Sequence, residues 1–241
     1  STPSNSSAAS DVYKRQDSGG NFEDATVETR LSDIVKAVAI LQEKSGVQRI
    51  GLLGMRLGAT WAGMTTAEFA VGAQDTVSIG PLILWDPVIN VKRFLDNEFR
   101  QAITFQSVLF HKILFDRKQI IERLVSDGKV EQQGYLLNVI DGCIISRDFY
   151  MQSVDIDLSA KLRDYSGNML IAQIDKSNAH FRDELTDLAE LCRSVGGEVD
   201  LIQVTESMPW WTPGGENRVS EPDRLFDVTE RWISKIMGDC T

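Results

Sequence analysis

Four short apolar runs alternate with segments of helical periodicity, and this alternation most constrains what the chain can fold into. The runs cover residues 49–53, 82–86, 169–174 and 198–204. Apolar residues at helical spacing precede the first run and follow the third and the fourth. Strands that alternate with helices form parallel sheets, because each parallel connection needs a crossover. The sequence therefore predicts an α/β fold with a doubly wound parallel sheet.

The helices at the two ends of this pattern have recognisable limits. Before the first strand, either Asp24 or Thr26 can cap a helix, and Gly46 suits its C-terminal end, where a left-handed residue is favoured. A last helix is expected near residues 222–237. Its side chains expected to face inward are Leu225, Phe226, Val228, Trp232 and Ile236.

The first strand runs directly into Gly54-Met55-Arg56-Leu57-Gly58, and small residues follow in the next helix. A strand, a Gly-x-x-x-Gly turn and a helix form the nucleophile elbow of certain hydrolases, in which the central side chain stands above the sheet edge. Here the central residue is Arg56. Its guanidinium stays protonated and has no lone pair with which to attack a carbonyl. The motif therefore predicts an elbow without a nucleophile.

Four motifs of the chain are similar to those of a known group: FEDAT (22–26), GMRLGAT (54–60), LILWDPVINVKRFL (82–95) and MPWWTP (208–213). On these motifs the chain resembles the hydrolase-like proteins of the α/β-hydrolase superfamily that are associated with exosortase systems. The resemblance covers roughly residues 17–237 and implies an α/β-hydrolase fold with a helical cap. An arginine at the elbow recurs in that group.

The resemblance also implies where a catalytic triad would lie. The nucleophile position is Arg56, and Asp86 is a better acid than Asp175, which comes slightly early. No histidine follows His180, and the loop after the last strand offers Trp210 and Trp211 instead. Two of the three members needed for Ser-His-Asp catalysis are therefore absent.

The chain divides into three parts on composition and pattern. Residues 1–16 are rich in serine and alanine and are expected to be a disordered or artefactual leader. Residues 17–97 and 166–241 are assigned to the hydrolase core, and residues 98–165 to a helical cap insertion. No strand is expected between residues 91 and 162. Residues 17–22 match the loop after the fourth strand of the hydrolase fold, so an N-terminal truncation that removes the first four strands is expected.

The candidate ligand-binding residues are Met55, Arg56, Asp86, Trp210 and Trp211. Because a helix N-terminus disfavours a cation, Arg56 is expected within about 4 Å of a compensating carboxylate, that of Asp86. The pair either fills an inactive site or, with backbone N–H groups, binds a small anionic ligand. The two tryptophans either line a pocket for an apolar or sugar-like ligand or plug the cleft.

Other classes of site are not indicated. The net charge of −10 argues against a nucleic-acid partner, and no apolar run approaches the ~20 residues that span a bilayer. No metal-binding motif is present, and the GxxGxxxG spacing after residue 50 does not match a dinucleotide-binding loop, so neither metal nor cofactor is expected.

His111 is expected on a helix face and His180 in a solvated loop. Three scattered cysteines indicate no disulfide framework, and a cytoplasmic location is expected.

Two functions follow from these observations. The first is a non-catalytic α/β-hydrolase-like protein that binds a small molecule or a partner in an exosortase-type envelope pathway, a link that rests on the resemblance. The alternative is an active hydrolase of esters or related acyl substrates with an unassigned nucleophile. The oligomeric state is left open.

Overall fold

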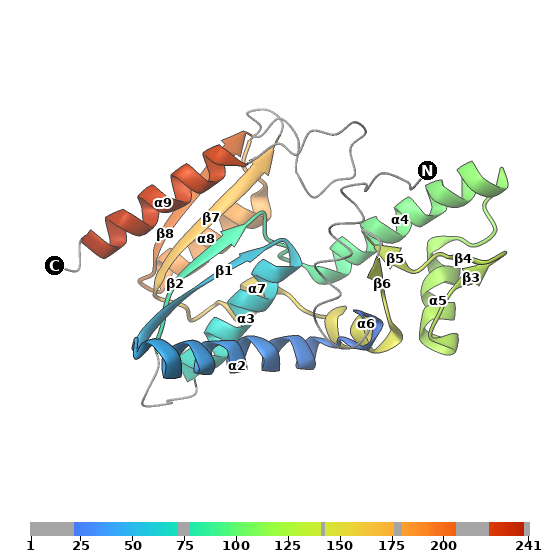
Figure 1. Ribbon diagram of the computed structural model, residues 1–241. Helices are drawn as coiled ribbons and strands as arrows, with labels where there is room; N and C mark the ends of the chain where they lie inside the picture. Colours follow the sequence, from blue (N-terminus) through green and yellow to red (C-terminus); the bar gives the residue numbers. More distant parts are fainter. Residues whose placement is uncertain (1–21, 72–77, 141–142, 176–179, 206–221, 239–241) are drawn as a thin grey trace, which may run out of the picture.

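A parallel sheet of four strands, in the order β1-β2-β7-β8, forms the centre of the molecule (Figure 1). The computed structural model describes residues 22–71, 78–140, 143–175, 180–205 and 222–238. Each predicted apolar run overlaps one strand, so the predicted α/β class with a parallel sheet is confirmed. The strands are Arg49–Met55 (β1), Ser78–Trp85 (β2), Asn168–Asp175 (β7) and Glu198–Thr205 (β8).

Helices cover both faces of this sheet, which makes it doubly wound. Helices α3 (Leu57–Val71) and α8 (Asp183–Ser194) pack on one face, against alternate strand residues such as Leu82 and Leu84. Helix α9 (Asp223–Gly238) packs on the other face, against the intervening residues such as Ile83. Burial on both faces explains why the two central strands, β2 and β7, read as continuous apolar runs.

The two helices whose ends were predicted differ in how well the prediction holds. Helix α2 (Val27–Ser45) follows the N-cap Thr26 and ends at Gly46, which has the expected left-handed conformation. In α9, Leu225 and Trp232 are buried as predicted, but Phe226 is 54% exposed. Phe226 lies about 100° around the helix from Leu225, and its ring contacts the edge of Trp85 rather than entering the core.

The segment between β2 and β7 contains strands as well as helices. Its helices are α4 (Val91–Phe110), α5 (Arg117–Asp127), α6 (Arg147–Ser153) and α7 (Leu158–Lys161). Two hairpins lie between α5 and α6, formed by β3 (Glu131–Gln132) with β4 (Tyr135–Leu136) and by β5 (Val139–Ile140) with β6 (Cys143–Ile144). The expectation of no strand in this segment is therefore wrong. Strands of two residues are too short to show alternation in the sequence.

This cap segment shares a core with the helices beside the sheet. Phe99 of α4 and Leu124 of α5 belong to one buried cluster with Trp61 of α3. A short 3-10 helix, η1 (Phe22–Asp24), precedes α2. Helix α4 runs without a break through the expected boundary at residues 97–98 and ends at His111, which is its left-handed C-cap. His111 therefore terminates the helix instead of lying on its face.

Candidate functional site

The turn after β1 places Arg56 at the sheet edge. Arg56 adopts a left-handed conformation with φ 52, and its N–H donates to the carbonyl of Trp85 at 2.9 Å. The carbonyl of Arg56 accepts from Ala59 N at 3.0 Å, so α3 starts immediately. A non-glycine residue with positive φ is uncommon and marks a constrained turn. The geometry is that of the predicted elbow, with arginine at its centre.

The neighbouring strand ends in a second left-handed residue. Asp86 has φ 45, and its N–H donates to the carbonyl of Ala172 at 2.7 Å. Because β1 and β2 are adjacent, both turn residues face the same cleft. Arg56 Nη1 lies 3.9 Å from Asp86 Oδ2, as the sequence predicts. The side chains are 26% and 13% exposed, so this ion pair is only partly solvated.

The pair belongs to a longer chain of alternating arginines and carboxylates. Asp86 Oδ1 accepts from Arg182 Nη2 at 2.6 Å, and Arg182 Nη1 lies 3.9 Å from Glu184. Glu184 also pairs with Arg93 of α4. At the other end, Arg56 Nη2 lies 3.9 Å from Glu98, also on α4. This arginine–carboxylate chain therefore starts and ends on α4 and links the cap to the elbow.

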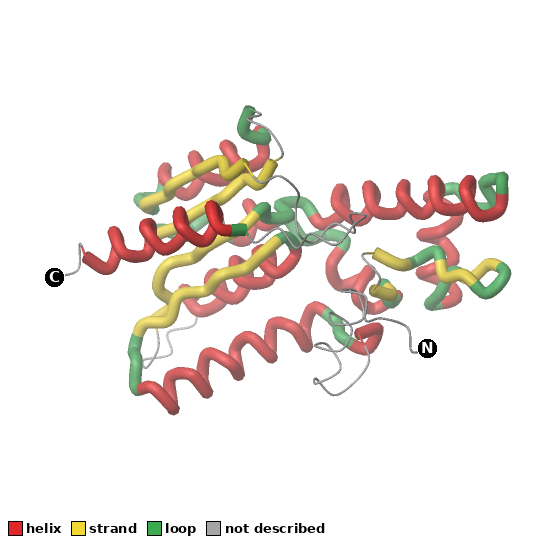
Figure 2. Tube along the Cα trace, turned by 45° about the horizontal axis from the view of Figure 1, so that its top comes forward, coloured by secondary structure: helices red, strands yellow, loops and turns green. Residues whose placement is uncertain are grey.

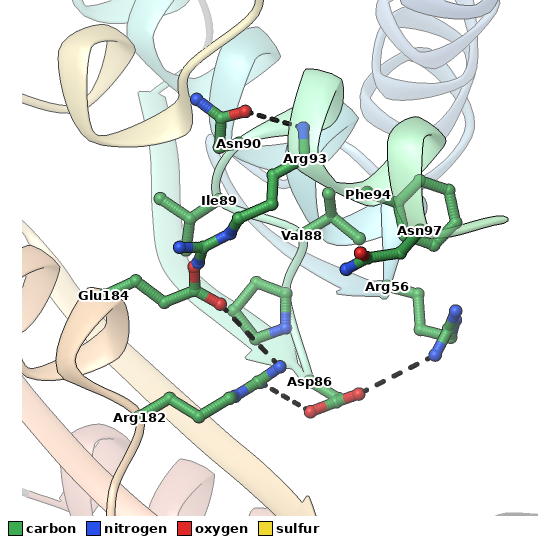
Figure 3. A pocket seen from close by; sticks show the side chains of 11 residues that line it. Arg56, Asp86, Val88, Ile89, Asn90, Arg93, Phe94, Asn97, Arg182 and Glu184 are labelled. Carbon is green, nitrogen blue, oxygen red and sulfur yellow. Dashed lines mark hydrogen bonds and ion pairs between the residues drawn. The ribbon is translucent and has the colours of Figure 1, made fainter. Parts of the chain in front are cut away.

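The arginine–carboxylate chain borders a small pocket of about 120 Å³ (Figure 3). Arg56 and Asp86 enter from the strand ends, Arg182 and Glu184 from the start of α8, and Arg93 from α4. The rest of the lining comes from Asn90, Phe94 and Asn97 and from the apolar residues 87–89. The Arg56 guanidinium lies 5.4 Å from the centre of that ring. Three arginines and two carboxylates line the pocket, and Glu98, 3.9 Å from Arg56 but outside the lining, balances the third positive charge.

Burial at the bottom of this pocket changes the acidity of Asp86. Loss of hydration raises its pKa above the ordinary value for aspartic acid, and the charge of Asp175 acts in the same direction. Arg182, Arg56 and a hydrogen bond from the backbone of Ile174 lower the pKa. The net effect is a raised pKa. Keeping Asp86 ionised therefore costs folding free energy, despite the two arginines beside it.

The sequence identified two residues of this site and missed others. Met55 is partly buried and packs against the cluster on the α9 face of the sheet, and it does not line this pocket, so its role in binding stays a prediction. Trp210 and Trp211 lie outside the described residues, so their role stays a prediction. Arg182 and Glu184 look like ordinary residues at a helix start, and Glu98 lies in the cap, far from the elbow in sequence. No motif connects these three residues to Arg56.

Other groups able to carry chemistry lie apart from this pocket. His180 is exposed in a loop, as predicted, and its carbonyl accepts from the side chain of Gln173. Cys192 is buried, and burial raises its pKa to about 11. Within the described residues, no cluster of His, Cys, Asp and Glu is suited to a metal ion. No helix in this part of the chain is both long and apolar enough to cross a membrane.

Comparison with known proteins supports the fold. No family profile matches the sequence, and no curated protein does. The structure is similar to that of Est1E from Butyrivibrio proteoclasticus with bound ferulic acid, with a TM-score of 0.55 and 12% identity over 90% of this chain and 71% of that one. A second structure of Est1E gives a TM-score of 0.53 at 13% identity, over 89% of this chain and 72% of that one. At such low identity the similarity establishes the fold alone, and the fold is that of the α/β-hydrolases.

Proposed function

We propose that this protein is a non-hydrolytic α/β-hydrolase-fold protein that binds a compact anion in the pocket at the elbow. The observation that carries the proposal is Arg56, which occupies the turn where a nucleophile would stand. A serine hydrolase needs a hydroxyl there and a histidine to take its proton. The chain contains only His111 and His180, one at the end of α4 and one in the loop after β7.

The charge and size of the pocket indicate the class of ligand. Three guanidinium groups line the pocket against two carboxylates, and guanidinium groups bind carboxylate, sulfonate and phosphate oxygens by charge-assisted hydrogen bonds. The volume of about 120 Å³ is well below the ~300 Å³ at which pockets for drug-sized ligands begin. The separation of 3.9 Å between Arg56 and each of Asp86 and Glu98 exceeds hydrogen-bond length. Charge attraction at ion-pair range therefore holds the Arg56 guanidinium between these two carboxylates at the wall of the pocket.

The wider role follows from the sequence motifs only. Their resemblance to exosortase-associated hydrolase-like proteins supports a role in an exosortase-type envelope pathway, exercised from the cytoplasm. The alternative, hydrolysis of an ester or related acyl substrate, requires a nucleophile at some other position. The similarity of the fold to that of Est1E is the observation that supports this alternative.

Purified protein should not react with a fluorophosphonate probe and should not hydrolyse p-nitrophenyl acetate above the buffer rate. Arg56→Ser should remain inactive in both assays, because a hydroxyl at the elbow would still lack a histidine positioned as its base. A known serine esterase processed in parallel is the control. Stoichiometric labelling of one serine in the unmodified protein would favour the hydrolase alternative.

Anion binding is measured with methanesulfonate, a monoanion at every working pH. Side-chain and amide NMR shifts of the pocket residues should titrate with it, and Arg56→Gln should weaken the affinity about tenfold, or ~1.4 kcal/mol, for one lost charge-assisted interaction. Arg163→Gln is the matched control, because Arg163 is 73% exposed and, among the described residues, pairs with its neighbour Asp164. Equal losses in both variants would mean that the ion responds to overall charge and not to this pocket.

A further inference from the structure

Large apolar side chains gather on the surface at the far end of the cap. They are Phe105, Val108 and Leu109 at the end of α4, Ile113 in the turn that follows, and Tyr135 in β4. Their exposed fractions are 43%, 69%, 38%, 59% and 47%, in that order. We call these five residues the tip patch. Exposed apolar groups that occur together, unlike scattered ones, indicate a contact surface.

The tip patch is continuous across two elements. Phe105, Val108 and Leu109 are spaced at i, i+3 and i+4, so they share one side of the helix. The ring of Tyr135 lies 6.2 Å from that of Phe105 and 5.9 Å from that of Phe110. Both views place this end of α4 and the β3–β4 hairpin at the extremity of the molecule farthest from α9 (Figures 1 and 2). The tip patch therefore protrudes and can meet a flat surface.

The turn below the tip patch is firmly held. The side chain of Gln106 is fully buried, and its Oε1 accepts from Leu114 N at 3.0 Å and Phe115 N at 2.9 Å. Its Nε2 donates to the carbonyl of Phe115 at 2.9 Å. Asp116 then caps α5 with a reciprocal pair of hydrogen bonds to Gln119. The apolar side chains therefore stand on a fixed turn, so ordering them against a partner costs little entropy.

The charge of this end differs from that of the whole protein. The chain has 35 acidic residues and a net charge of −10, yet residues 101–115 contain none of the 35. The ionisable side chains in that stretch are His111 and Lys112, and both are exposed. Extended to residue 136, which takes in α5 and the β3–β4 hairpin, this end has five lysines and arginines and four acidic residues, among them the exposed Glu131 of β3. A weakly basic end is the part of an acidic protein that an anionic surface repels least.

We propose that the tip patch inserts into the interfacial layer of an anionic phospholipid bilayer and holds the protein at its surface. Exposed aromatic and aliphatic side chains beside a lysine are the combination that lies at a lipid headgroup boundary. A symmetric contact with a second copy fits less well, because it would bring His111 and Lys112 close to their own copies. The cap lies on the bilayer and does not cross it. The proposal does not depend on what the elbow pocket binds.

The test is co-sedimentation of the full chain with vesicles of phosphatidylcholine containing 30% phosphatidylglycerol. The protein should bind these vesicles, and Val108→Asp should reduce the bound fraction at least fivefold. Lys112→Gln should reduce it about fivefold, the effect of one basic residue near an anionic surface. Ile40→Asp is the matched control, because Ile40 is 50% exposed on α2 and receives the same charge outside the tip patch. It should bind like the unmodified protein.

Two results would overturn the proposal. One is absence of binding to these vesicles, or equal binding by Val108→Asp and the unmodified protein when circular dichroism shows both folded. The other is a dimer in sedimentation velocity that Val108→Asp dissociates while the unmodified protein stays off the vesicles, which would assign the tip patch to a second copy.

Discussion

Gly54→Ala is expected to lower the free energy of unfolding by about 4 kcal/mol, and so to leave little folded protein at 37 °C. Gly54 is buried at the end of β1. A Cβ atom there would lie 2.3 Å from the carbonyl oxygen of Gly58 and 2.6 Å from Cα of Ala59. Both are backbone atoms of the helix start, so no side-chain rotation can relieve the overlap. Urea unfolding followed by circular dichroism measures the loss.

Gly58→Ala is the matched control for this prediction. Gly58 is the other glycine of the elbow motif, yet a Cβ there meets nothing within 4 Å. It lies exposed in the first turn of α3, where alanine is favoured over glycine by roughly 0.5–1 kcal/mol. The control variant should therefore be as stable as the unmodified protein or slightly more so. Equal destabilisation by both substitutions would contradict the contact argument.

The two glycines show what a motif can and cannot convey. The spacing in the sequence identifies a sharp turn between a strand and a helix, and the structure confirms it. The sequence does not tell which glycine is needed for close approach, because that depends on how tightly α3 folds back after Arg56. Only the positions of the backbone atoms separate a required glycine from an incidental one.

The centre of the sheet was predictable because its two middle strands, β2 and β7, are buried on both faces. Residues such as Leu82 and Ile83 face opposite layers of helices, so the run is apolar without alternation and stands out in the sequence. The β3–β4 hairpin gives no such signal. Its strands have two residues each, and its turn is Gln133-Gly134, both with positive φ. The sequence did contain a stronger cue for the second hairpin, the Asp141-Gly142 pair between β5 and β6.

The ion pair at the elbow was predictable for an electrostatic reason. An arginine at a helix start needs a carboxylate, and Asp86 follows directly on the adjacent strand. The remaining partners could not be predicted, because Glu98 and Arg182 reach the site through tertiary packing of the cap and of α8. Long charged side chains leave few traces of their contacts in sequence spacing.

Asp86→Ala is expected to lower the free energy of unfolding by about 2 kcal/mol at pH 7. The substitution removes the acceptor of the 2.6 Å bond from Arg182 and a carboxylate beside Arg56. It also places alanine at a φ of 45, which aspartate and asparagine tolerate better. The loss stays below the 3–5 kcal/mol typical of a fully buried pair, because Arg56 and Arg182 keep contact with water and with Glu98 and Glu184.

Asp86→Asn separates the charge of this residue from its hydrogen bonding. Asparagine keeps an acceptor oxygen for Arg182 and the tolerance for a left-handed turn. At pH 7 it should change stability by no more than about 0.5 kcal/mol, because burial opposes the charge of Asp86 and offsets the attraction of the arginines. A loss at pH 7 as large as that of Asp86→Ala would contradict this balance.

The same balance sets the expected pH dependence. Because the pKa of Asp86 is raised in the folded protein, the folded state binds a proton more tightly than the unfolded state. The unmodified protein should therefore gain stability relative to Asp86→Asn as pH falls through the raised pKa towards about 3.9, the ordinary value, and lose it again as pH rises. Urea titrations of both proteins at intervals from pH 7 to pH 4 measure the difference. If the unmodified protein instead loses stability relative to Asp86→Asn as pH falls, Arg56 and Arg182 outweigh the loss of hydration. Ionisation of the carboxylate would then stabilise the fold.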